Sequence, residues 1–149
     1  MFRVIVLSGL VLMASGVFVS PAIALPSVIG KPGKAANVVR SIEVTMNDGM
    51  RFAPDRIDVR RGETIRLIVR NAGALRHELV LGRPADLKQH AELMRRHPHM
   101  EHDDPYAVSV PPGETRELIW RFSHSGQVDF GCLVPGHYEA GMHGKVKVN

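Results

Sequence analysis

Short segments in which apolar and polar residues alternate recur along the chain after residue 40. An alternation with a period of two is typical of strands that bury one face and expose the other. Clusters of Gly, Pro, Asn and Asp, which favour turns, separate these segments. The alternating segments cover residues 42–46, 64–70, 77–81, 108–110, 118–122, 128–132 and 145–148. Short strands with regular turns predict an all-β fold, a Greek-key antiparallel β-sandwich of two sheets.

Residues 84–96 interrupt this rhythm and predict one short inserted helix. Pro84-Ala85-Asp86 is typical of a helix start, and Gln89 follows Asp86 at the spacing of a capping box. The apolar residues of the segment recur at helical spacing and would form one stripe; they are Leu87, Ala91 and Met94.

Residues 1–24 have the features of a secretory signal peptide. An apolar run covers residues 4–19 after Arg3, and Ala22-Ile23-Ala24 matches the small-residue pattern of a cleavage site. A retained membrane anchor is the alternative, but the run is shorter than the roughly 20 residues of a membrane-spanning helix. We therefore expect export to the periplasm, with no membrane span after the signal is removed.

The remaining residues are expected to form one domain behind a short leader. Residues 25–40 contain two prolines and two glycines without sustained periodicity, which predicts a flexible leader. Residues 41–149 carry the alternating segments and are predicted to be the domain itself. This length is sufficient for a single hydrophobic core, and a second domain is not expected.

The amino-acid composition excludes several classes of site and of function. Cys132 is the only cysteine, which rules out an intramolecular disulfide, a zinc ribbon with paired cysteines and a two-cysteine binuclear copper site. The small formal net charge of +4 would either aid docking to an acidic redox partner or serve solubility alone. Basic residues are scattered and aromatic residues are few, which argues against nucleic-acid binding. No hydrolytic triad is apparent, and we do not expect an enzyme.

Three potential metal ligands lie close together near the C-terminus. His137 follows Cys132 by five positions, and Met142 follows His137 by five more, in a stretch whose Pro135 and glycines allow tight turns. A thiolate, an imidazole and a thioether form a soft donor set that suits copper. The alternative is that Met142 fills the core and His137 faces solvent.

His77 is the best candidate for a fourth ligand. Strand parity puts its side chain on the same face as the apolar Leu79 and Leu81, and parity also turns Cys132 inward. An isolated inward histidine would more often be a hydrogen-bonded core residue. Together with the C-terminal set, however, it completes the two histidines, one cysteine and weak axial methionine of a mononuclear type 1 (blue) copper site.

A second group of potential ligands lies between the predicted helix and the next strand. Histidine-rich tracts bind metals readily, so this segment could form a second, labile copper site. The alternative is a polar lid packed over the sandwich. The candidate ligands are Met94, His97, His99, Met100 and His102.

The chain resembles the cupredoxins, the superfamily of plastocyanin, azurin and auracyanin, and more narrowly the periplasmic copper-resistance cupredoxins of Gram-negative bacteria. The segments that carry this likeness are RHELVLG at 76–82, MEHDDP at 100–105 and VDFGCLVPGHYEAGM at 128–142. The resemblance covers residues 41–149 and implies a cupredoxin-like sandwich with His77, Cys132 and His137 as equatorial copper ligands and Met142 as the axial one. Many cupredoxins have Asn after the first histidine, whereas this chain has Glu78, so the bracing of the cysteine loop is open.

These observations predict an exported, monomeric copper protein with one type 1 site. The resemblance implies a role in copper tolerance or homeostasis with one-electron Cu(I)/Cu(II) chemistry. The alternative is a dedicated periplasmic electron carrier between respiratory redox partners, whose partner protein the sequence does not identify. A copper-free interaction domain is disfavoured because all four ligands are present.

Overall fold

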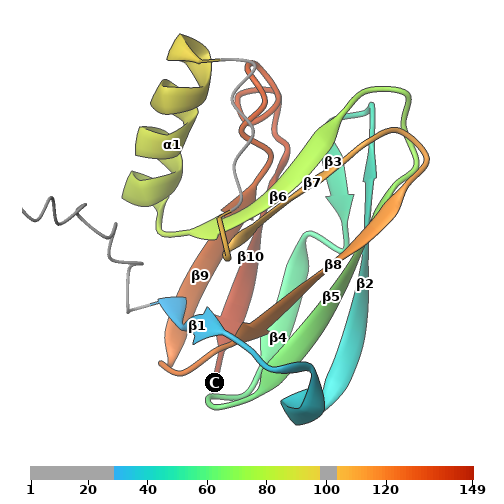
Figure 1. The fold of residues 1–149 in the computed structure, drawn as a ribbon. Helices are drawn as coiled ribbons and strands as arrows, with labels where there is room; N and C mark the ends of the chain where they lie inside the picture. The colour runs from blue at the N-terminus through green and yellow to red at the C-terminus, as the bar shows by residue number, and fades with distance from the viewer. Residues whose placement is uncertain (1–28, 98–103) are drawn as a thin grey trace, which may run out of the picture.

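The computed structural model describes residues 29–97 and 104–149, whose strands form two five-stranded sheets (Figure 1). The first sheet has the order β1 (Lys31–Pro32), β8 (Thr115–Arg121), β5 (Thr64–Asn71), β2 (Arg40–Asn47) and β3 (Arg51–Ala53). The second has the order β4 (Arg56–Val59), β10 (His143–Val148), β9 (Gly126–Gly131), β6 (His77–Gly82) and β7 (Ala107–Val110). The prediction of an all-β sandwich with one inserted helix is confirmed.

Both sheets are mixed, which the sequence did not predict. The pair β2 and β5 and the pair β4 and β10 run parallel, while the other pairs run antiparallel. The chain between β2 and β5 passes through β4 in the opposite sheet before it returns. The alternation of side chains records which face of a strand is buried and carries no information on the direction of its neighbours. The antiparallel prediction therefore differs from the structure at these two pairs.

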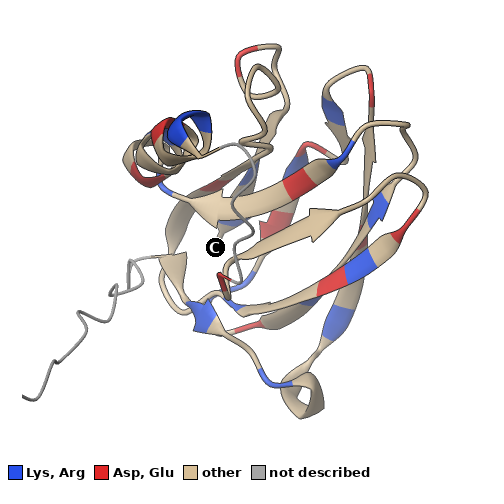
Figure 2. Ribbon diagram, turned by 45° about the horizontal axis from the view of Figure 1, so that its top comes forward, with Lys and Arg blue, Asp and Glu red and all other residues tan. Residues whose placement is uncertain are grey.

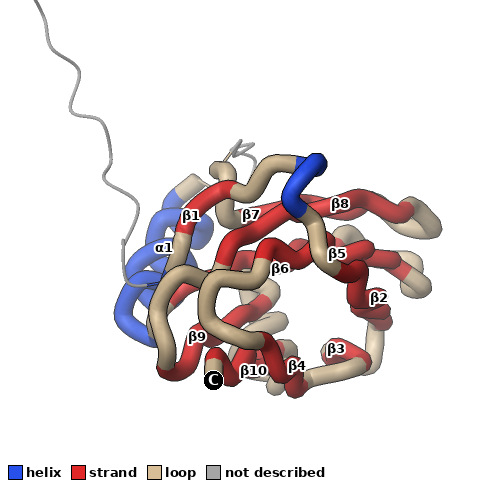
Figure 3. The backbone as a smooth tube through the Cα atoms, turned by 90° about the horizontal axis from the view of Figure 1, so that it is seen from below, coloured by secondary structure: helices blue, strands red, loops and turns tan. Residues whose placement is uncertain are grey.

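The hydrophobic core is formed by buried side chains from both sheets, whose strands are seen from below in Figure 3. Phe52 from the first sheet and Phe130 from the second pack edge to face, with ring centroids 5.1 Å apart. Other large and fully buried core residues also come from alternating strand positions; they include Trp120, Met46, Ile65, Leu67, Leu79 and Leu81, and Phe122 directly follows β8. Cys132 and Met142 belong to this same cluster, so the predicted metal site forms part of the core.

Residues 29–40 differ from the predicted flexible leader because they are packed on the sandwich. β1 pairs with β8, and a short 3-10 helix, η2 (Ala35–Asn37), follows it. Ile29 is buried, and its carbonyl accepts a hydrogen bond from the Trp120 indole N–H at 2.8 Å. Backbone pairing, one buried side chain and one tryptophan hydrogen bond contribute to holding this segment, and none of them produces a periodic pattern in the sequence. Residues 1–24, predicted as the signal peptide, and 25–28 lie outside the described residues.

The inserted helix α1 (Pro84–Arg96) covers the outer face of the second sheet beside β6 and β9 (Figures 1 and 3). Its buried residue Leu87 packs against Val80 and Leu133. The N-terminal cap of α1 differs from the predicted capping box of Asp86 and Gln89. Arg83 precedes the helix, its backbone N–H donates to the Asp86 carboxylate at 3.1 Å, and its guanidinium donates to the same carboxylate.

None of the helices within residues 29–97 and 104–149 is long and apolar enough to cross a membrane. Figure 2 shows basic and acidic residues interspersed over strands and loops.

Candidate metal centre

Three of the predicted ligands meet at one end of the second sheet. His77 is the first residue of β6, and Cys132 follows the last residue of β9 directly. Because β6 and β9 are antiparallel neighbours with Val80 opposite Gly131, the start of one strand lies beside the end of the other. His137 comes from the loop between β9 and β10.

The three donor atoms form a small triangle. Nδ1 of His77 lies 3.2 Å from Nδ1 of His137, and Sγ of Cys132 lies 3.3 Å from the His137 nitrogen and 4.0 Å from the His77 nitrogen. A point equidistant from the three atoms is about 2.1 Å from each, within the range of metal–imidazole bonds and slightly below metal–thiolate bonds. All three side chains are buried. One copper ion fits this arrangement.

Backbone hydrogen bonds of the loop connect Met142 with Cys132 and His137. The Cys132 N–H donates to the Met142 carbonyl at 3.0 Å, and the Met142 N–H donates to the His137 carbonyl at 3.0 Å. Gly136 and Gly141 adopt positive φ values of 88° and 100°, which side chains with a Cβ disfavour. Met142 is completely buried and belongs to the same core cluster as Cys132.

Glu78 braces the cysteine from two sides. Its backbone N–H donates to Sγ of Cys132 at 3.5 Å, and its carboxylate accepts the Leu133 N–H at 3.0 Å. Glu78 therefore holds Leu133, the residue after the cysteine. The sequence alone left open whether a glutamate at this position could brace the cysteine loop. Burial raises the pKa of the Glu78 carboxyl above its usual value.

Asp48 is a residue of the site that the sequence analysis missed. One of its carboxylate oxygens lies 3.0 Å from Nε2 of His77, on the side of the ring opposite the donor triangle. The Ala74 N–H, which donates to the carboxylate at 2.7 Å, and then His77 lower the pKa of Asp48. The sequence shows only that Asn47-Asp48-Gly49 is typical of a turn. No spacing rule connects that turn with a histidine 29 residues later.

Without a bound metal, the surroundings of Cys132 favour the protonated thiol over the thiolate. Burial raises the pKa of the Cys132 thiol to about 12, although the Glu78 N–H acts in the opposite direction. Burial and the neighbouring His77 lower the pKa of His137, which keeps its imidazole neutral and able to bind a metal. A bound cation would displace the thiol proton, because the thiolate is the ligand form of cysteine.

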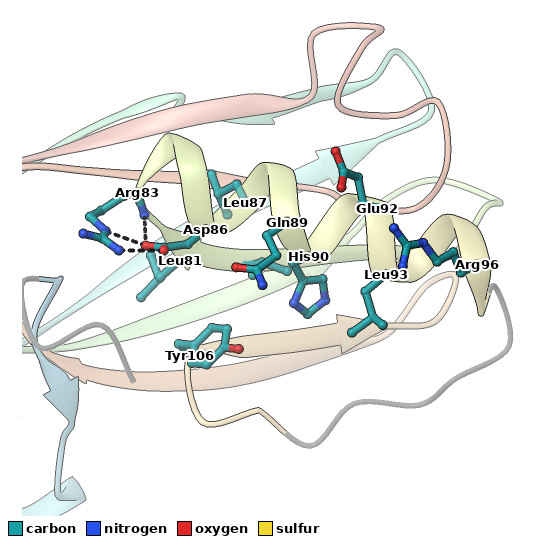
Figure 4. A pocket seen from close by; sticks show the side chains of 11 residues that line it. Leu81, Arg83, Asp86, Leu87, Gln89, His90, Glu92, Leu93, Arg96 and Tyr106 are labelled. Carbon is teal, nitrogen blue, oxygen red and sulfur yellow. Dashed lines mark hydrogen bonds and ion pairs between the residues drawn. The ribbon is translucent and has the colours of Figure 1, made fainter. Parts of the chain in front are cut away.

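The second group of predicted ligands is only partly described. Met94 is a buried residue of α1, and His97 is exposed at the end of the helix. His99, Met100 and His102 lie outside the described residues, so the second copper site stays a prediction. A pocket of about 490 Å³ lies beside α1, between the helix and Tyr106 (Figure 4). None of His77, Cys132, His137 or Met142 is among the residues that line it.

Comparison with known proteins points to the same chemistry. The profile of the family described as "Copper binding proteins, plastocyanin/azurin family" matches residues 38–149. The chain is 52% identical over 119 residues to the copper-resistant cuproprotein CopI of Rubrivivax gelatinosus, covering 80% of this chain and 72% of that protein. It is 36% identical over 148 residues to the copper-resistant cuproprotein CopI of Pseudomonas aeruginosa, covering 80% of this chain and 81% of that protein.

Among solved structures, the chain is similar to auracyanin A, a blue copper protein of the bacterium Chloroflexus aurantiacus. The two share 25% sequence identity with a TM-score of 0.62, over 73% of this chain and 98% of auracyanin A. The fold of this chain is thus similar to that of a known copper protein. At one end of its sandwich, two histidines and one cysteine lie close together.

Proposed function

The chain belongs to the plastocyanin/azurin family of copper-binding proteins, and we propose that it serves copper tolerance in the periplasm as a carrier of one type 1 copper ion. The observation that carries this proposal is the buried triangle of two imidazole nitrogens and one sulfur. Export through residues 1–24 would place the protein in the compartment where this role is needed.

The proposed ligands are His77, Cys132 and His137 around the ion and Met142 as the weak axial donor. Two imidazoles, a thiolate and a thioether form a borderline-to-soft set that accommodates both Cu(I) and Cu(II). Such an ion supplies one-electron redox chemistry when bound. The four residues lie in the core and in a loop closed by backbone hydrogen bonds, so the protein frame would change little when one electron is gained or lost.

Similarity to proteins named copper-resistant cuproproteins favours copper tolerance over a dedicated electron carrier. Deletion of the gene is expected to lower the copper concentration at which growth stops, because the periplasm would lose a protein that binds copper. Growth in graded copper should recover with the wild-type gene and not with a Cys132→Ser gene. Unchanged copper tolerance together with reduced respiratory electron flux would instead support the electron carrier.

Met142→Leu is expected to keep copper and the blue colour but to raise the reduction potential. The substitution removes a thioether from a completely buried position while it preserves an apolar side chain of similar volume. The potential of such sites is tuned by the axial ligand, and a tenfold change in the ratio of Cu(II) to Cu(I) affinity corresponds to about 59 mV. A redox titration measures the change.

The matched control is Met46→Leu, which makes the same chemical change at a buried position of β2. Its potential should equal that of the wild type. Equal potentials in the wild type and the Met142 variant would show that Met142 only fills the core.

A further inference from the structure

Asp48 lies directly behind one of the proposed copper ligands, in the turn between β2 and β3. Resting on the function proposed above, we propose that Asp48 is a positioning residue that fixes the tautomer of His77 and stabilises Cu(II) relative to Cu(I). The contact between Asp48 Oδ1 and His77 Nε2, at 3.0 Å, carries this proposal. Asp48 itself does not belong to the donor triangle.

The chemistry of the two groups decides which ring nitrogen carries the proton. An ionised carboxylate can only accept hydrogen bonds, so Nε2 of His77 must be the donor. In the neutral ring Nδ1 then keeps a free lone pair. This lone pair belongs to the nitrogen that lies 3.2 Å from Nδ1 of His137 and 4.0 Å from Sγ of Cys132. Asp48 therefore prepares His77 to bind through the nitrogen that faces the other donors.

The carboxylate is itself held by the loop that leads into β6. The Ala74 N–H donates to Oδ2 at 2.7 Å, and the Leu75 N–H donates to Oδ1 at 3.2 Å. A side chain at Gly73 would collide with the Asp48 carboxylate, so glycine is required for this approach. The turn and the loop thus form a cradle that sets the position of the acceptor before a metal binds.

The same loop is tied to the body of the domain. Asn71 is completely buried, and its amide donates to the carbonyls of Leu75 at 2.7 Å and Val110 at 2.9 Å. Its side-chain oxygen accepts the Gly73 N–H at 2.9 Å. Because the loop that holds the Asp48 carboxylate and leads into His77 is fixed in this way, the fold sets the position of the acceptor behind the imidazole ring.

The charge of Asp48 acts on the redox balance. A carboxylate that accepts the distal N–H of a metal-bound imidazole makes that imidazole a more basic ligand, which favours the more highly charged ion. Such partners typically change metal affinity by about 10- to 100-fold. The Asp48 side chain is 39% exposed, so water screens part of its charge and we expect the lower end of this range.

The test is the reduction potential of the copper-loaded Asp48→Asn variant. Asn preserves the shape and an acceptor oxygen but removes the charge. We expect the Cu(II) affinity to fall about tenfold relative to the Cu(I) affinity, which corresponds to a rise of about 59 mV in the potential. Gly73→Ala should shift the potential in the same direction, because it displaces the carboxylate while keeping its charge.

The matched control is Glu139→Gln, which removes one exposed carboxylate from the metal loop itself; the only contact described for that side chain is an ion pair with Arg95 at 3.8 Å. Its potential should equal that of the wild type. A shift in Asp48→Asn no larger than in Glu139→Gln would overturn the proposed redox effect, because net charge alone would then account for the result.

A measurement without copper separates this inference from the proposed function. Nitrogen-15 NMR of the apoprotein is expected to show His77 protonated at Nε2 in the wild type and a mixture of tautomers in Asp48→Ala. Equal tautomer populations in the two proteins would overturn the positioning role. If the wild type bound no copper, the proposed function would fail together with the redox effect, and the NMR result would still decide the positioning role.

Discussion

Cys132→Ser is expected to abolish the intense blue absorption of the copper-loaded protein. This colour arises from charge transfer between a thiolate sulfur and Cu(II), and the described residues offer no other thiol. The Cys132 sulfur lies 3.3 Å from Nδ1 of His137 and accepts the Glu78 N–H, so a serine hydroxyl would replace the central soft donor with a hard one. Visible absorption and copper content after Cu(II) loading measure the loss.

His143→Ala provides the control for this variant. His143 follows Met142 directly but is exposed, and its ring packs beside that of Tyr138 with centroids 5.1 Å apart. The colour and copper content of this variant should match those of the wild type. A colourless wild type after loading, or a blue Cys132→Ser protein, would contradict the type 1 site.

Alternation along the strands was sufficient to orient two of the proposed ligands. His77 has the same parity as Leu79 and Leu81, and Cys132 has the same parity as Val128 and Phe130. The structure places both side chains in the interior with no exposed surface. This succeeded because alternate side chains of a strand point to the same face, and the face shared with Leu79, Leu81, Val128 and Phe130 lies against the core between the sheets. The other face of β6 is buried as well, so parity gave the direction of His77 and not its burial alone.

Contacts between segments distant in sequence could not be predicted in the same way. Asp48 belongs to a turn and Glu78 to a strand, and neither position differs in pattern from an ordinary surface carboxylate. Each gains its role only when a loop from another part of the chain presents N–H groups, Ala74 and Leu75 for one and Leu133 for the other. The segment at residues 29–40 was missed for a related reason, since a tryptophan 91 residues away anchors it.

Two carboxylates with different surroundings thus support the site. Asp48 is partly exposed, and hydrogen bonds lower its pKa, so it remains charged behind His77. Glu78 is buried, and desolvation raises its pKa. We expect the first to act mainly on the copper through its charge and the second mainly on the geometry of the cysteine loop. Substitutions that separate charge from hydrogen bonding should distinguish the two roles.

Glu78→Leu is expected to destabilise the protein by about 1–3 kcal/mol, because it leaves the buried Leu133 N–H without its acceptor. The backbone N–H that reaches Sγ of Cys132 is unchanged by the substitution, so the effect reports on the side chain alone. Urea denaturation of the apoprotein measures the free energy of unfolding. In the copper-loaded protein, a loosened residue 133 should also speed the transfer of copper to a competing chelator.

Glu78→Gln is the matched comparison, because it keeps the side-chain oxygen that accepts the Leu133 N–H while it removes the charge. If the hydrogen bond braces the loop, the Gln variant should retain the wild-type free energy of unfolding and rate of copper loss, whereas the Leu variant should not. Wild-type stability and wild-type copper loss in both the Leu and the Gln variant would show that packing alone holds the cysteine loop. If Gln were as damaging as Leu and both differed from the wild type, the negative charge rather than the acceptor would be the essential property of residue 78.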